Sequence, residues 1–178
     1  RKSWQDGSIM EKIVRNYIEI KSINELSEVK KPSNNFSLKE VSTNDFQLNK
    51  FFYKQIGKYH HWIDRLVWTD KNWIEYISNP NLFTFVLKKN GDIAGFFELI
   101  YHQNKSEIEI AYFGLLKEYL GKKLGGYMLS EAIKKSFSYN VKRVWAHTCS
   151  LDHRYALNNY LSRGMKIYYT ETANVKSA

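Results

Sequence analysis

One stretch of the sequence decides the fold: Glu109-Ile-Ala-Tyr-Phe-Gly-Leu-Leu-Lys-Glu-Tyr-Leu-Gly-Lys-Lys-Leu-Gly-Gly126. It reads as a strand, then a glycine-rich turn that contains Lys122 and Lys123, then the start of a helix. Backbone N–H groups at a helix start are unpaired, and the helix dipole adds positive potential there. Glycines let a phosphate approach the backbone closely. The stretch therefore predicts a site for a phosphate-bearing, nucleotide-like ligand, although it is neither a Walker loop nor a GxGxxG fingerprint.

A second stretch follows: His153-Arg-Tyr-Ala-Leu-Asn-Asn-Tyr-Leu-Ser-Arg-Gly-Met165. It places Ala156, Tyr160 and Gly164 four residues apart, on one face of a helix. Taken alone, this spacing is more typical of a helix that turns an aromatic side chain into the core. The glycine-rich turn upstream favours a functional interpretation.

Together, the two stretches resemble the cofactor half of a GNAT-type N-acetyltransferase of a bacterial-like subgroup. That family carries Gln/Arg-x-x-Gly-x-Gly/Ala in the turn and Asn-x-x-Ala-x-x-x-Tyr-x-x-x-Gly-Phe near the end. Gly125 matches the last glycine of the first signature, while Leu120 stands at the Gln/Arg position and Lys123 at the first glycine. In the second signature, His153 replaces the asparagine and Met165 the phenylalanine.

The resemblance extends from about residue 15 to about residue 170. It implies an α/β domain with the GNAT acyl-CoA N-acyltransferase fold. In that fold a mixed, mostly antiparallel sheet is flanked by helices, and the parallel strands 107–114 and 143–148 splay apart around the cofactor. The implied activity is transfer of an acetyl group from acetyl-CoA to a primary amine, by direct attack of the amine. The resemblance assigns cofactor binding to Phe113, Gly114, Leu115, Leu120, Gly121, Lys122, Lys123, Leu124, Gly125, Gly126, His153, Ala156 and Asn159.

The implied chemistry needs one proton donor and one proton acceptor. The resemblance gives Tyr160 the role of protonating the departing sulfur, and the ordinary pKa of a phenol is about 10. For the acceptor, Glu109 opens the strand in which GNAT enzymes often carry a catalytic glutamate, whereas Glu98 lies among apolar neighbours in the preceding strand. The sequence does not choose between them. Strand alternation predicts a shared face for Glu107, Glu109, Ala111 and Phe113.

An aromatic stretch supplies candidates for the acceptor pocket. Trp62, Trp68 and Trp73 can wall the amine site, because aromatic faces attract an ammonium group. The same residues can instead pack two helices onto the sheet, and both interpretations stay open.

The rest of the chain predicts the framework of one domain over residues 36–172, preceded by an extension, 1–35, whose residues 13–20 form an extra strand or a short helix. Thr43 or Asn44 caps a first helix, and Thr69 or Asp70 caps a second. Asn90-Gly91 predicts a hairpin turn. The expected order is strand 36–41, helix to 56, helix to 78, strands 82–87, 93–101 and 107–114, helix 124–139, strand 144–148, helix 153–162 and strand 165–170.

Composition limits the remaining options. The 178 residues carry a formal charge of +9 and a single cysteine, Cys149. One cysteine fits a reducing cytoplasm, and no apolar run approaches the roughly 20 residues of a membrane span. His147, Cys149 and His153 lack a second ligand pair at zinc spacing, so no metal is predicted.

Two other functions remain as alternatives. A GNAT-like fold that has lost acetyl transfer would suit the replacements at Leu120 and Lys123. A basic nucleic-acid-binding module would suit the charge, but the lysines are spread along the chain, which argues against it. The expected partners are therefore acetyl-CoA and a small-molecule amine, and the resemblance adds a homodimer as an option.

Overall fold

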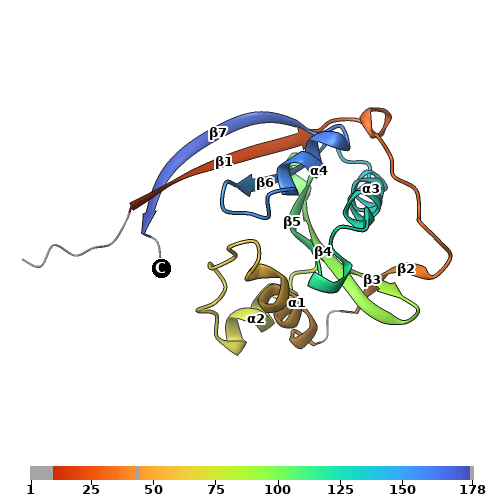
Figure 1. Cartoon of the computed structure of the whole chain (residues 1–178), viewed down its shortest axis with the longest axis horizontal. Coiled ribbons are helices and arrows are strands. Elements are labelled where there is room, and N and C mark those ends of the chain that lie inside the picture. Colours follow the sequence, from red (N-terminus) through yellow and green to blue (C-terminus); the bar gives the residue numbers. More distant parts are fainter. Residues whose placement is uncertain (1–9, 43–44, 177–178) are drawn as a thin grey trace, which may run out of the picture.

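The computed structural model describes residues 10–42 and 45–176. Within them, one seven-stranded sheet has the order β2-β3-β4-β5-β6-β1-β7 (Figure 1). Every neighbouring pair is antiparallel except β5 and β6. The strands are β1 (Met10–Ile20), β2 (Phe36–Val41), β3 (Leu82–Lys89), β4 (Asp92–His102), β5 (Glu107–Leu115), β6 (Arg143–Cys149) and β7 (Lys166–Lys176). The predicted mixed α/β class is confirmed.

Helices cover both faces of the sheet (Figure 1). The α-helices of the described residues are α1 (Gln47–Gly57), α2 (Asp70–Ile77), α3 (Leu124–Phe137) and α4 (Ala156–Ser162). The larger core lies under α3, where Leu129 and Ile133 pack with Ile108 of β5. The smaller core lies under α1, where Phe52 stacks on Phe96 of β4 with ring centroids 4.8 Å apart.

Local signals fixed several element ends. Thr69 caps α2 through a capping box with Asn72, as one of the two predicted caps. Asn90 and Gly91 both have positive φ, which matches the predicted hairpin turn. The predicted caps Thr43 and Asn44 lie outside the described residues. Helix α4 begins at Ala156, three residues later than expected, because residues 150–155 form turns instead.

Strand β1 lies inside the sheet, between β6 and β7. It pairs with β6 from Arg15 opposite Cys149 to Ile20 opposite Val144, and with β7 on its other side. Ile18 and Ile20 alternate into the larger core and are fully buried. Figure 1 shows β1 and β7 running together beyond the rest of the sheet. The first described strand therefore joins the last two strands of the chain.

Strands β5 and β6 separate soon after they meet. Their parallel pairing covers only Glu107–Glu109 opposite Arg143–Trp145. On its other side, β5 stays paired with β4 as far as Leu115. The edge of β5 that faces β6 is therefore open beyond Glu109, as the splayed pair in the expected fold requires.

A bulge in β5 changes which side chains share a face. Leu99 of β4 pairs with Ile110 and Glu98 with Tyr112, so Ala111 is an extra residue. The predicted shared face of Glu109 and Phe113 is therefore wrong. Phe113 lies in the α3-side core, with its ring 6.2 Å from that of Tyr160.

Candidate active site

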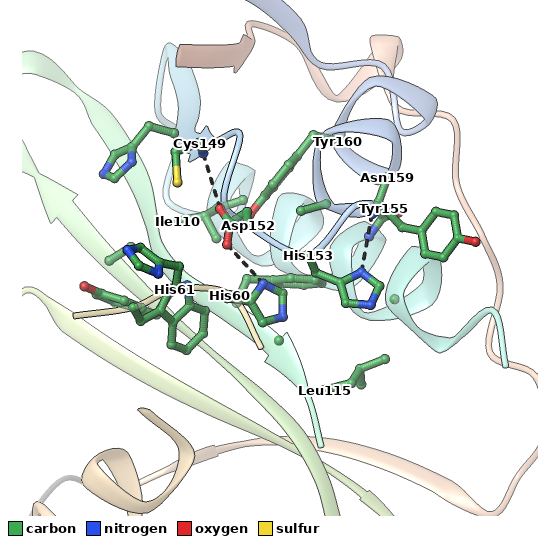
Figure 2. Close-up of a pocket in the computed structure, with 18 of the residues that line it drawn as sticks. His60, His61, Ile110, Leu115, Cys149, Asp152, His153, Tyr155, Asn159 and Tyr160 are labelled. Atoms are coloured by element: carbon green, nitrogen blue, oxygen red, sulfur yellow. Dashed lines mark hydrogen bonds and ion pairs between the residues drawn. The ribbon is translucent and has the colours of Figure 1, made fainter. Parts of the chain in front are cut away.

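The splay opens into a cavity of about 910 Å³. Its walls come from β5, the C-terminal end of β6, the starts of α3 and α4, and the connection between α1 and α2. Figure 2 shows side chains from these separate segments converging on it. The volume is in the range of small-molecule and cofactor sites.

One end of the cavity is the glycine-rich turn. Gly121 has φ +77°, and a Cβ atom there would meet nothing within 4 Å. Lys123 precedes α3 with φ +60°, and its side chain makes no capping hydrogen bond to the helix. The first N–H groups of α3 therefore remain available to an anion. Lys123 occupies a left-handed conformation, which costs less free energy for glycine than for a residue with a side chain.

Most residues with a predicted cofactor role line this cavity, and Lys122 does not. The lining includes Phe113, Gly114, Leu115, Leu120, Gly121, Lys123, Leu124, Gly125, Gly126, His153, Ala156 and Asn159.

Tyr160 reaches the cavity from α4. It is largely buried, and its hydroxyl points toward Asp152 (Figure 2). Burial raises the pKa of Tyr160, and the negative charge of Asp152 raises it further. The phenol therefore keeps its proton near neutral pH and is able to donate to a developing anion.

The structure separates the two candidate proton acceptors. Glu109 lines the cavity, and its Oε1 lies 3.0 Å from His102 Nε2. Glu98 is 0% exposed, faces α1 and α2, and is not part of the cavity wall. Of these two glutamates, Glu109 is therefore the one that a bound molecule can reach.

Glu98 instead belongs to a buried ion pair. Its oxygens accept hydrogen bonds from Arg65 Nη1 at 3.3 Å and Nη2 at 3.2 Å, from Asn49 Nδ2 at 2.9 Å and from the Tyr76 hydroxyl at 2.6 Å. These donors engage both carboxylate oxygens. The carboxylate therefore holds the α1–α2 region on the sheet, and the expectation that it acts as a base is corrected.

The three tryptophans divide between the two interpretations. Trp62 lines the cavity, 4.8 Å from the ring of Tyr112. Trp68 and Trp73 do not line it and pack instead against Arg65, at 4.7 and 5.4 Å from the guanidinium carbon to the ring centroids. Their predicted role in the acceptor pocket is corrected to helix packing.

Several cavity residues escaped the sequence analysis. His60 Nδ1 lies 3.1 Å from Asp152 Oδ1, and Thr148 donates to Asp152 Oδ2 at 2.6 Å. Asp64 accepts from the Tyr112 hydroxyl at 2.6 Å. His60 and Asp152 are 92 residues apart in the sequence, so no spacing rule could join them.

The far wall comes from β1 and β6. Arg15, His147 and Cys149 line the cavity there, and the alternation of β6 puts the last two on one face. Burial lowers the pKa of His147, and the positive charge of Arg15 lowers it further. Nearby carboxylates, of which Glu109 has the largest effect, raise the pKa but do not cancel this lowering. The imidazole is therefore neutral near pH 7. Among the described residues, no His, Cys, Asp and Glu side chains gather in a group that could hold a metal ion.

Membrane insertion has no helical candidate. In the part of the chain that the structure describes, no helix combines the length and the apolar character that a crossing requires.

Comparisons with known proteins agree on the fold. The chain is similar to a GCN5-related N-acetyltransferase from Sphaerobacter thermophilus, with 12% identity, a TM-score of 0.65, and coverage of 96% of this chain and 54% of that one. It is also similar to a GCN5-related N-acetyltransferase from Kribbella flavida, with 13% identity and a TM-score of 0.64. That match covers 94% of this chain and 59% of the other. A third similar structure is an aminoglycoside acetyltransferase from an uncultured soil metagenomic sample, with 12% identity and a TM-score of 0.60. That match covers 75% of this chain and 90% of the other. The chain thus spans little more than half of the first two.

No curated protein matches this sequence significantly. A sequence model described as the acetyltransferase (GNAT) family matches residues 46–165. That segment contains the splayed strand β5, the glycine-rich turn, and α4 with Tyr160. Since the match covers most of the chain and both signature stretches, the chain belongs to the GNAT acetyltransferase family.

Proposed function

We propose that the chain transfers an acetyl group from acetyl-CoA to a primary amine of a small molecule. One observation carries the proposal: the open edge of β5 beyond Glu109 leads from the uncapped start of α3 to the hydroxyl of Tyr160 within one cavity. An extended ligand with a phosphate group at one end and a reactive group at the other fits this arrangement.

The residues at the phosphate end suit coenzyme A. The first N–H groups of α3 and the Lys123 ammonium would hold the pyrophosphate. The pantetheine arm would run along the open edge of β5, whose free backbone groups would bind it like an added strand. When bound, acetyl-CoA supplies the acetyl thioester. N–H groups near Phe113–Leu115 would polarise its carbonyl group.

The residues at the reactive end divide the proton transfers. Glu109 takes a proton from the arriving ammonium group, so that the nitrogen has a free electron pair for attack. Tyr160 donates its phenolic proton to the departing sulfur. Asp64 and the face of Trp62 lie on the same cavity and suit a cationic acceptor.

The first test is calorimetry with acetyl-CoA. We expect saturable binding, and an absence of binding at millimolar cofactor would remove the proposal. Turnover is then followed by thiol release over a panel of amines that includes diamines, amino acids and aminoglycosides. Binding of acetyl-CoA without transfer to any amine would favour the alternative of a fold that has lost its activity.

Replacing Tyr160 with phenylalanine removes the proton donor and keeps the ring. We expect kcat to fall about 100-fold or more, since positioned acids contribute roughly 10²–10⁴-fold, with affinity for acetyl-CoA nearly unchanged. Tyr169→Phe is the matched control, because Tyr169 is exposed and does not line the cavity. Equal kcat in the two variants would remove the acid from the mechanism.

Replacing Lys123 with glycine separates backbone strain from charge. The left-handed position favours glycine, so the free energy of unfolding of Lys123→Gly should stay the same or rise by up to about 1 kcal/mol. Loss of the charge should weaken acetyl-CoA binding by up to about five-fold at low salt, as for an exposed ion pair. Lys123→Asn, which tolerates this backbone, should lose the same affinity. Lys122→Gln should keep it, because Lys122 lies outside the cavity.

A further inference from the structure

A histidine–aspartate pair joins two walls of the cavity. His60 follows α1, and Asp152 lies in the turn between β6 and α4. Their side chains are only 11% and 14% exposed, and His60 Nδ1 lies 3.1 Å from Asp152 Oδ1. Both residues line the cavity that also contains Tyr160.

The surroundings of Asp152 fix the tautomer of the imidazole. The second carboxylate oxygen, Oδ2, accepts a hydrogen bond from the Thr148 hydroxyl at 2.6 Å and a longer one from the Cys149 amide at 3.4 Å. With both oxygens acting as acceptors, Nδ1 of His60 must donate. In the neutral imidazole the proton therefore sits on Nδ1, which leaves the electron pair on Nε2.

That electron pair is available to a ligand. Among the described residues, Nε2 of His60 has no hydrogen-bond partner. The neighbours packed on the ring are Trp62, at 5.1 Å between ring centroids, and His153, at 5.6 Å. Figure 2 shows Asp152 between the His60 ring and the Tyr160 hydroxyl. The charge of Asp152 also helps to raise the pKa of Tyr160, which agrees with their proximity.

We propose that His60, oriented by Asp152, accepts the second proton that the acceptor nitrogen loses during acetyl transfer. This role rests on the proposed function. An ammonium group must lose two protons to become an amide. Glu109 takes the first, before attack. As the bond between nitrogen and the acetyl carbon forms and the bond between that carbon and sulfur breaks, His60 Nε2 takes the second and Tyr160 protonates the sulfur. One of the two protons then returns to Tyr160 through water and the other passes to solvent, which balances the reaction.

Kinetics of His60 variants test the role. We expect His60→Gln to lower kcat about 10²–10⁴-fold while KM for acetyl-CoA changes less than two-fold. His60→Ala should recover part of its kcat when imidazole is added, which a merely structural residue would not do. The matched control is Tyr59→Phe, since Tyr59 is exposed, precedes His60 in the chain and does not line the cavity. It should keep wild-type kcat.

A second measurement does not depend on turnover. Long-range ¹H–¹⁵N spectra of the free protein should show the Nδ1–H tautomer for His60, and Asp152→Asn should abolish that preference. An Nε2–H tautomer in the wild type would overturn the proposal, as would full kcat in His60→Gln. Wild-type protein that transfers acetyl to no amine would overturn the proposed function and this role together. Wild-type turnover with an unaffected His60→Gln would overturn this role alone.

Discussion

Replacing Glu98 with alanine is expected to lower the free energy of unfolding by about 3–5 kcal/mol, the typical cost of leaving a buried charge without its partner. For a chain of this length the loss corresponds to a Tm lower by roughly 6–20 °C. Urea denaturation followed by circular dichroism measures the first quantity, and a thermal scan measures the second.

The size of the effect follows from the surroundings of Arg65. Its side chain is 4% exposed, so it cannot turn to water when Glu98 is removed. Five aromatic rings surround the guanidinium, with its carbon 4.0–5.6 Å from their centroids: Tyr53, Trp68, Trp73, Tyr76 and Tyr112. Cation–π attraction from these rings does not replace the lost carboxylate.

Two comparisons show whether burial is the cause. Glu75→Ala breaks the exposed Lys71–Glu75 pair at 4.0 Å and should cost no more than about 0.5 kcal/mol. The double variant Glu98→Leu/Arg65→Met should be more stable than Glu98→Ala, because no charge is left unpaired. A loss below 1 kcal/mol for Glu98→Ala would show that water reaches Arg65.

Replacing Gly164 with alanine is expected to cost about 3 kcal/mol or more. Gly164 has φ +104°, where a side chain is strained. A Cβ atom would also overlap the carbonyl oxygen of Glu25, and backbone cannot move aside as a flexible side chain can. The neighbouring Ser27 amide donates to the Arg163 carbonyl at 2.9 Å, so the clash falls where the segment after β1 is fastened to the end of α4.

Gly121→Ala separates the two contributions. Gly121 also has positive φ, at +77°, but its Cβ position is open. The free energy of unfolding of Gly121→Ala should therefore fall only by the backbone strain, about 1–2 kcal/mol. Equal losses in the two variants, measured by urea denaturation, would mean that the segment around Glu25 relaxes around the methyl group.

The features that the sequence predicted well are local. The capping box at Thr69, the turn at Asn90-Gly91 and the helix that carries Ala156 and Tyr160 each depend on a few neighbouring residues. The predicted helical face does not extend to Gly164, which lies beyond the end of α4 with φ +104°. Periodicity and turn chemistry capture such features, because backbone geometry decides them. The order of these elements then carried the family resemblance, which the match over residues 46–165 supports.

The features that it missed depend on distant partners. The sequence makes Glu98 a candidate base, whereas in the fold its carboxylate pairs with Arg65, 33 residues away. The bulge at Ala111 moved Phe113 to the other face, and alternation cannot foresee an inserted residue. The His60–Asp152 pair forms only because two turns meet across a cavity. In each case tertiary packing, which has no short-range signal, decided the outcome.

The place of β1 has a consequence for how the chain is made. Of the strands in its sheet, β1 is synthesised first, yet its partners β6 and β7 are synthesised last. During synthesis Ile18 and Ile20 cannot lie between their partner strands until β6 and β7, which begin at Arg143, have left the ribosome. Pairings between such distant segments carry a large loop-closure cost and slow folding. Until β6 and β7 are made, the apolar side of β1 has no strand to pair with, which is the condition that favours aggregation of a nascent chain.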